Sequence, residues 1–576
     1  MLVPRAAAPH RAPAAVDAAP DLILHNARIL TLDGAGRTAQ AVAIRRGRIA
    51  AIGSTADAMR LRGARTRLED LGERMVTPGL TDGHAHLDRE GLKSVYPALG
   101  PVRSIADIQD RIADLARRAP PGAWIVTMPI GTPPEYLDNR PDALAEGRWP
   151  TRHDLDRPAG GRPVLIRCVW GFWTTRLPIV SCANSRALAL AGIDRTTRPP
   201  LPMIRLETDA AGDPTGVIVE SEYQPLAELL WFRAATRLSP ADRMRTLPAS
   251  AAAYHACGTT AVVEAHGVAD EALHAWRAAD AAGRIHMRAV LPASHVWSDA
   301  DLADIDGAVR TIAARQARSA SGRLSTAGLY VQFQKRPSDV LRSSFAPNTG
   351  WAGFNYATGV TPEAFRPIAL ACARHDVRLF INFGLAAKAL DVLEAVNREV
   401  PLRDRRWVLS HVTDATPREI DQIARLGLGV GAHLNPSIYK NGDAMLTGRL
   451  ANRPNEIAPM RQLIDAGIPV GLETDNVPVS LFWPIWEAVA RTSIGGRPVA
   501  PGQAIAVTEA LRCAAWGGAW LAGDEAERGT LEVGKAADLV VLDRDVLAAG
   551  EGAGVGLRET RAVRVMVAGR WVYERG

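Results

Sequence analysis

Two kinds of hydrophobic pattern separate the ends of this 576-residue chain from its middle. Apolar and polar residues alternate through residues 22–32, which predicts a strand, and residues 41–52 predict two more strands around an Arg-Gly turn. At the other end, residues 537–542 form a continuous apolar run, and residues 563–573 predict a hairpin. We expect the two ends to combine into one small β-sandwich domain.

Between the ends, short apolar runs alternate with Ala- and Leu-rich helical stretches. The predicted strands cover residues 259–263, 329–333, 378–382, 406–410, 427–432 and 469–472, and the predicted helices cover residues 365–375, 387–398, 417–425 and 458–466. Strands that alternate with helices at this spacing pair in parallel, and so many repeats predict an α/β fold of the closed (β/α)8 TIM-barrel type.

The expected domain organisation follows from these patterns. The Pro- and Gly-rich stretch at about residues 100–240 does not follow the strand–helix rhythm and predicts an insertion that covers the barrel mouth. The expected segments are a disordered leader (1–20), the first part of the sandwich (21–75), the barrel with its insertion (76–522) and the rest of the sandwich (523–576).

Composition narrows the class of protein. Hydrophobic residues make up 47% and charged residues 23% of the chain, which is typical of a globular protein and excludes wholesale disorder. The net charge of +6 is spread without blocks of like charge, so we expect neither nucleic-acid nor membrane binding. The N-terminus lacks the apolar segment of a secretion signal, and the five cysteines form no CxxC pair. These features favour a cytoplasmic protein in a reducing compartment.

The strongest chemical signal is the segment VTPGLTDGHAHL at residues 76–87. His84 and His86 are two residues apart at the end of a predicted strand, so the period of two places both imidazoles on the same side. Imidazole is the commonest metal ligand, and such a pair supplies two of the three or four ligands that a catalytic divalent ion needs. The pair therefore predicts a metal site.

With this segment, two others carry a resemblance to a known family. They are LIDAGIPVGLETDNVPV at residues 463–479 and RGTLEVGKAADLVVLDRD at residues 528–545. Together the three resemble the amidohydrolase superfamily, in particular its YtcJ-like branch, which includes N-substituted formamide deformylase. The resemblance runs from about residue 20 to residue 576 and is weakest in the insertion. It implies a metal-dependent hydrolase barrel flanked by a β-sandwich.

Position by position, the resemblance implies four metal-site residues. His84 and His86 match the metal-binding pair of the first barrel strand, and Asp475 matches the last-strand aspartate that contacts the metal and takes a proton from the attacking water. His411 matches the histidine of strand six, as a ligand or beside one. The catalytic residues are therefore expected to be Asp475 and His411. The cofactor is expected to be one divalent ion, zinc first, with iron, manganese or cobalt as alternatives.

Two positions depart from the family pattern. The strand-five histidine is replaced by Asn382, which we interpret as substrate-facing or as a weak oxygen ligand. The strand-four lysine, carboxylated in some relatives to bridge two metals, falls on Val331 or Gln332, and Lys335 lies beyond the expected strand end. Gln cannot form a carbamate, so we expect one metal rather than two.

Other side chains are candidates for the vacant position or for substrate binding. Glu264 and His266 are two residues apart at the end of a predicted strand, and His433 follows another. The predicted substrate-binding residues are Asn382, Gln332, Glu264, His266 and His433.

The leading functional hypothesis is hydrolysis of a C–N bond in an N-substituted amide or formamide by metal-activated water. One alternative keeps the metal but performs decarboxylation, isomerisation or oxygenation. Another is a catalytically weak relative that binds a ligand. The expected partner is a small-molecule substrate. Barrels with such sandwiches often dimerise, so the family analogy also suggests a homodimer.

Overall fold

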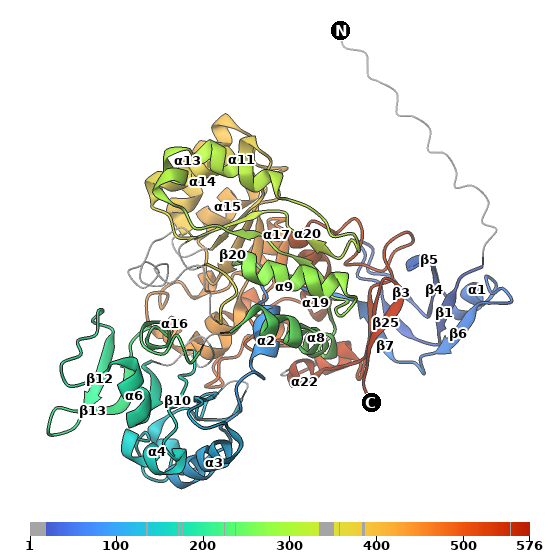
Figure 1. Cartoon of the computed structure of the whole chain (residues 1–576). Coiled ribbons are helices and arrows are strands. Elements are labelled where there is room, and N and C mark those ends of the chain that lie inside the picture. Colours follow the sequence, from blue (N-terminus) through green and yellow to red (C-terminus); the bar gives the residue numbers. More distant parts are fainter. Residues whose placement is uncertain are drawn as a thin grey trace.

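The computed structural model of this chain describes residues 19–576 except 134–135, 171–172, 174–176, 224, 237, 333–350, 356–357, 383–385 and 553. Residues 1–18 of the predicted leader lie outside the described residues, as does Lys335. The fold is α/β, with helices packed around parallel strands in the middle of the chain (Figure 1).

The middle of the chain forms two parallel sheets. One has the order β17-β15-β14-β8 and the other the order β16-β18-β19-β20-β21-β22. Their strands are β8 (Leu80–Asp82), β14 (Thr259–Val263), β15 (Arg288–Val290), β16 (Ala293–Ser294), β17 (Leu324–Ser325), β18 (Leu329–Gln332), β19 (Leu379–Asn382), β20 (Val408–Val412), β21 (Gly429–Ala432) and β22 (Val470–Leu472). Where the sheets meet, Gly83 N, directly after β8, donates to Leu472 O of β22 at 2.9 Å.

Helices follow most of these strands and have clear sequence signals. They include α9 (Asp270–Ala281), α13 (Pro362–Arg374), α14 (Ala386–Glu399), α15 (Pro417–Leu426) and α17 (Met460–Asp465). For α15, Thr416 and Glu419 form a capping box, and Gly427 ends the helix in the left-handed conformation (φ 67°). Among the described residues, no helix combines the length and the apolar character that a membrane span needs.

The chain ends form two further sheets. The first is β5-β4-β1-β6, and the second is β25-β24-β23-β7-β2-β3. Their strands are β1 (Leu22–His25), β2 (Arg28–Leu30), β3 (Thr38–Ala39), β4 (Ala41–Arg45), β5 (Arg48–Gly53), β6 (Arg67–Asp70), β7 (Met75–Pro78), β23 (Leu539–Leu542), β24 (Ala562–Val567) and β25 (Arg570–Glu574). In Figure 1 the N-terminal strands lie beside β25, and β7 pairs antiparallel with β23.

The single strand predicted over residues 22–32 was wrong. The structure has β1 and β2 there, and they belong to different sheets, because Asn26 takes a left-handed backbone (φ 52°) that redirects the chain. The two sheets nevertheless share one hydrophobic cluster, in which Leu24 and Ile44 pack with Leu539 and Met566.

The stretch predicted as an insertion contains a sheet of its own. Its sheet has the order β12-β13-β11-β10-β9, with helices packed on it. The elements include α3 (Ile105–Arg118), β9 (Ile125–Thr127), α4 (Arg152–Ala159), β10 (Val164–Ile166), β11 (Ile179–Ala183), α6 (Ser185–Ala191), β12 (Ile204–Thr208) and β13 (Pro214–Glu220). One hydrophobic cluster lies entirely within it, and Figure 1 shows the unit at the opposite side of the molecule from the strands of the chain ends.

The helix that follows His86, α2 (Leu87–Leu92), packs on α8 (Pro240–Ala256) through a buried ion pair. The Arg243 guanidinium, 1% exposed, donates to the Asp88 carboxylate. Arg243→Ala is expected to lower the free energy of unfolding by about 3–5 kcal/mol, because Asp88 keeps a buried charge without this partner. Chemical denaturation checks this. Arg245→Ala is the control, because this side chain on the same helix is 61% exposed, and an equal effect of both variants would contradict the prediction.

Candidate metal centre

Histidines and acids from six parallel strands meet at one end of the two central sheets. Each of the residues lies near or just after the carboxyl end of its strand, and the carboxyl ends of parallel strands lie at the same edge. They are His84 after β8, Glu264 and His266 after β14, Asn382 in β19, His411 in β20, His433 after β21 and Asp475 after β22.

His84 and His86 converge in the structure. Their Nε2 atoms lie 3.2 Å apart, and both residues are almost fully buried. His84 Nδ1 lies 2.7 Å from Ser410 Oγ, which leaves Nε2 on the side that faces His86. Asn476 holds the second histidine at its backbone: the Asn476 side chain accepts from His86 N at 3.0 Å and donates to His86 O at 2.7 Å.

Asp475 lies directly against this pair. Its Oδ1 is 3.0 Å from His86 Nε2 and 3.2 Å from Arg89 Nη2. Its backbone is left-handed (φ 49°), and its N–H donates to His84 O at 3.0 Å, so the last strand is bonded to the first at the site itself. Burial acts to raise the pKa of Asp475, but His411 and Arg89 together lower it below its ordinary value. The Asp475 carboxylate is therefore ionised at neutral pH.

Three further histidines surround the pair. The His84 ring lies 4.1 Å from the His411 ring and 4.4 Å from the His266 ring, and the His411 and His433 rings are 4.7 Å apart. Burial lowers the pKa of all four of these histidines, that of His433 to about 3. Neutral imidazoles have a lone pair available for a metal.

The donor set fits a divalent ion. Among the described residues, three buried histidine nitrogens of the cluster find no hydrogen-bond partner: His266 Nδ1, His411 Nε2 and His433 Nε2. Three groups each bring their ligand atoms within 4.8 Å of one another: His84, His86 and His266; His84, His411 and Glu473; and His411, His433 and Asp475. Clustered, neutral and unpaired nitrogens beside a carboxylate are what zinc and related ions bind.

The other predicted residues lie close by with different contacts. Asn382 Nδ2 lies 3.3 Å from His266 Nε2, and Gln332 is its neighbour on the adjacent strand. Glu264 accepts from Leu87 N at 2.7 Å, and its other oxygen lies 3.7 Å from His86 Nδ1. Glu264 therefore contacts both His86 and the beginning of α2.

Sequence reasoning missed Glu473 and Arg89. Glu473 lies two residues before Asp475, so the strand period that linked His84 to His86 could have indicated it. The Glu473 side chain fits only because residue 431 is a glycine: a Cβ at Gly431 would lie 1.7 Å from Glu473 Oε1. Arg89 is three residues after His86, on α2, where helical spacing returns a side chain to the same face.

Glu473 supports two parts of the site at once. Its Oε1 accepts from Ser410 Oγ at 2.7 Å, and its Oε2 accepts from His411 N at 3.0 Å, where the backbone is left-handed (φ 60°). Burial raises the pKa of this carboxyl to about 8.

Glu473→Ala is therefore expected to weaken metal binding or lower kcat about 10–100-fold, as loss of a group that orients ligands typically does. Glu473→Gln is expected to retain most activity, because a carboxyl with a pKa of about 8 is mostly protonated at pH 7 and the amide is its neutral isostere. Steady-state kinetics and metal analysis of both variants check this, and equal losses in the two would contradict it.

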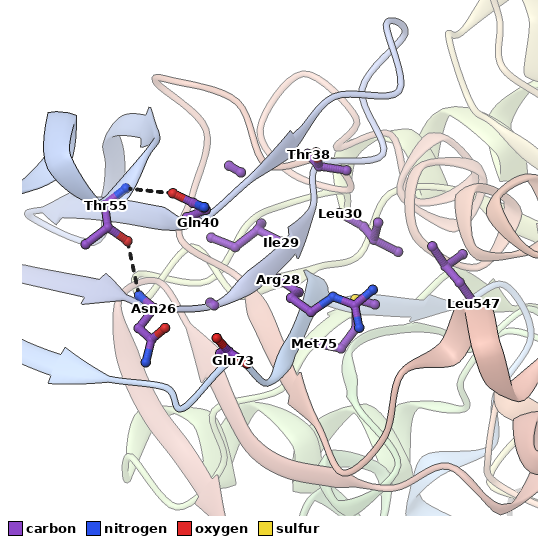
Figure 2. A pocket seen from close by; sticks show the side chains of 12 residues that line it. Asn26, Arg28, Ile29, Leu30, Thr38, Gln40, Thr55, Glu73, Met75 and Leu547 are labelled. Atoms are coloured by element: carbon purple, nitrogen blue, oxygen red, sulfur yellow. Dashed lines mark hydrogen bonds between the residues drawn. The ribbon is translucent and has the colours of Figure 1, made fainter.

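A separate cavity of about 670 Å³ lies on the sheets of the chain ends (Figure 2). Its wall includes Ile29, Leu30 and Leu547, and at its edge Asn26 N donates to Thr55 Oγ1 at 3.3 Å. None of its lining residues belongs to the histidine cluster, so the cavity is not part of the metal centre.

Comparisons of the sequence agree with this chemistry. The model of the amidohydrolase family matches residues 67–573. The chain is 29% identical over 572 residues to the N-substituted formamide deformylase of Arthrobacter pascens, covering 96% of this chain and 98% of that protein. It is 29% identical over 246 residues to the formimidoylglutamate deiminase of Pseudomonas aeruginosa, covering 39% of this chain and 50% of that protein.

Solved structures are similar in fold. An uncharacterized metal-dependent hydrolase from Pyrococcus furiosus superposes with a TM-score of 0.64 at 20% identity, covering 91% of this chain and 99% of that one. Atrazine chlorohydrolase TrzN from Arthrobacter aurescens, complexed with zinc, gives a TM-score of 0.50 at 18% identity, covering 96% of this chain and 95% of that one.

Proposed function

Because this chain belongs to the amidohydrolase family, we propose that its substrate is an N-substituted amide of the formamide type. The chain is a metal-dependent hydrolase that acts on carbon–nitrogen bonds other than peptide bonds. The deformylase relative, matched over almost its full length, supports the substrate class.

The observation that carries the proposal is the contact of Asp475 with the histidine pair, at 3.0 Å from His86 Nε2. We propose one zinc ion, held by His84, His86 and Asp475 with His411 as a further donor. Nitrogen and carboxylate donors of this kind suit zinc, and they also accept iron, manganese or cobalt. When bound, such an ion supplies a Lewis acid and lowers the pKa of water.

The side chains then perform the proton transfers. Asp475 accepts a proton from the water whose oxygen attacks the carbonyl carbon. As the C–N bond breaks, Asp475 gives this proton to the amine nitrogen, so the products are a carboxylic acid and an amine. Arg89, 3.2 Å from Asp475 Oδ1, keeps the carboxylate in place between these steps. His411 faces the same space, and we propose that its imidazole contacts the reacting groups.

The experiment that tests the proposal is a product analysis with N-substituted formamides in ¹⁸O-labelled water. We expect amine and formate in equal amounts, with one label in the formate. A product that keeps the C–N bond, or carbon dioxide without formate, would instead support the non-hydrolytic alternatives. Binding without turnover by fully metal-loaded protein would support the ligand-binding alternative.

The architecture is proposed on the same basis. We propose that β8, β14, β15 and β18–β22 are the eight strands of a (β/α)8 barrel, and the bond from Gly83 N to Leu472 O supports its closure. We further propose a β-sandwich from residues 21–75 and 523–576, supported by the cluster that both end sheets share, with the insertion at about residues 100–240 as a separate unit of the barrel domain.

A further inference from the structure

We propose that His266 is the metal ligand that takes the place of the missing strand-five histidine, and that Asn382, which stands in the strand-five position, orients it. The ligand would thus come from the second barrel strand instead of the fifth. The inference rests on the proposed metal site and adds one ligand to it.

The position of His266 is the first support. It follows β14, the neighbour of β8 in the sheet, so its side chain emerges beside the histidine pair. Ligand atoms of His84, His86 and His266 all lie within 4.8 Å of one another. The His266 ring is 4.4 Å from the ring of His84 and 4.9 Å from the ring of His86, close enough for one ion to contact all three.

The unpaired nitrogen is the second support. His266 Nδ1 is buried and has no hydrogen-bond partner in the part of the chain that the structure describes. A buried polar atom without a partner costs about 1–3 kcal/mol, a cost that a bound ion would remove. The rings of Tyr330 and Phe354, 5.0 Å and 4.8 Å from the His266 ring, pack against the imidazole.

Asn382 provides the third support. Its amide, which stands at the strand-five position, lies 3.3 Å from His266 Nε2. Nitrogen and oxygen of an amide exchange places by a rotation of 180°, and the rotated amide accepts from Nε2–H. Nδ1 then carries the lone pair. Ligating histidines usually donate their second N–H to such an acceptor, which fixes the ring.

This arrangement explains how the site tolerates Asn382. Asparagine is a poor zinc ligand, but it is a good hydrogen-bonding partner for an imidazole. Strand five would then position the ligand that strand two supplies. Two residues far apart in the sequence therefore share the task that one histidine performs in the family pattern.

The test measures metal binding directly, by competition with a chromogenic chelator for zinc. His266→Ala is expected to weaken zinc binding at least about 100-fold, and Asn382→Ala about 10-fold, in the range typical of an orienting group. His274→Ala, an exposed histidine on α9, is the matched control and is expected to bind as the wild type does. X-ray absorption of the zinc-loaded proteins should count one imidazole fewer in His266→Ala.

A double variant that moves the histidine from strand two to strand five gives the most specific test. The double substitution His266→Ala with Asn382→His restores the strand-five histidine and is expected to recover zinc affinity to within about 10-fold of the wild type. Unchanged zinc affinity and imidazole count in His266→Ala would overturn the inference while leaving the proposed function in place. Absence of zinc from the wild type would instead overturn the proposed function.

If His266→Ala does not fold, an anomalous-scattering map of the zinc-loaded wild type tests whether His266 binds the ion. A His266 nitrogen at about 2.0–2.1 Å from the ion supports the inference, and a separation beyond about 3 Å overturns it.

Discussion

Asp475→Asn is expected to lower kcat about 10³-fold or more, because an amide cannot accept a proton from water at neutral pH. Asp475 Oδ1 lies 3.0 Å from His86 Nε2, so the carboxylate is adjacent to the histidines proposed to hold the ion. Asparagine keeps the size of the side chain and one acceptor oxygen. The variant should therefore still bind metal, with reduced affinity. Initial rates, each normalised to the metal content of its preparation, measure the effect.

The control for this variant is Asp465→Asn, which removes a carboxylate that is 64% exposed and lies in α17. We expect its kcat to match the wild type. If Asp475→Asn kept wild-type kcat with full metal content, Asp475 would not be the proton acceptor. A loss of activity that parallels loss of metal would assign Asp475 to metal binding alone.

Removal of the metal is expected to lower activity to about 1% or less, because no side chain of the cluster replaces its Lewis acidity. Dialysis against a chelator followed by addition of zinc tests this, and activity should return in proportion to the ion bound. The melting temperature should rise with it, since an ion at 100 times its Kd stabilises the folded state by about 2.7 kcal/mol. Activity that survives complete removal would refute the metal-dependent mechanism.

The end point of the same titration tests the number of ions. We expect one equivalent per chain, because the strand-four position has Val331 or Gln332, and glutamine forms no carbamate bridge. The opposing observation is that His411, His433 and Asp475 form a second donor group. Activity that requires two equivalents would contradict the one-ion prediction and assign this group to a second ion.

Local sequence patterns were sufficient to predict several helices and strands. The helix predicted at residues 417–425 is α15 (Pro417–Leu426), because its cap and stop signals lie within the segment itself. The prediction for residues 22–32 failed because alternation does not report that a single left-handed residue, Asn26, moves the chain from one sheet to another. His84 and His86 converge as their spacing predicted, although both lie just beyond the end of β8, where Ser410 and Asn476 contact them.

The sequence by itself determined the alternation of strands and helices and the His-x-His pair, since both depend on residues that are near neighbours in the chain. Only the tertiary structure decided which other side chains surround that pair. His266, His411 and Asp475 come from strands separated by many residues, and each is ambiguous when read alone. They meet because parallel pairing brings the carboxyl ends of successive strands to one edge, where burial lowers the pKa of the imidazoles and keeps them neutral.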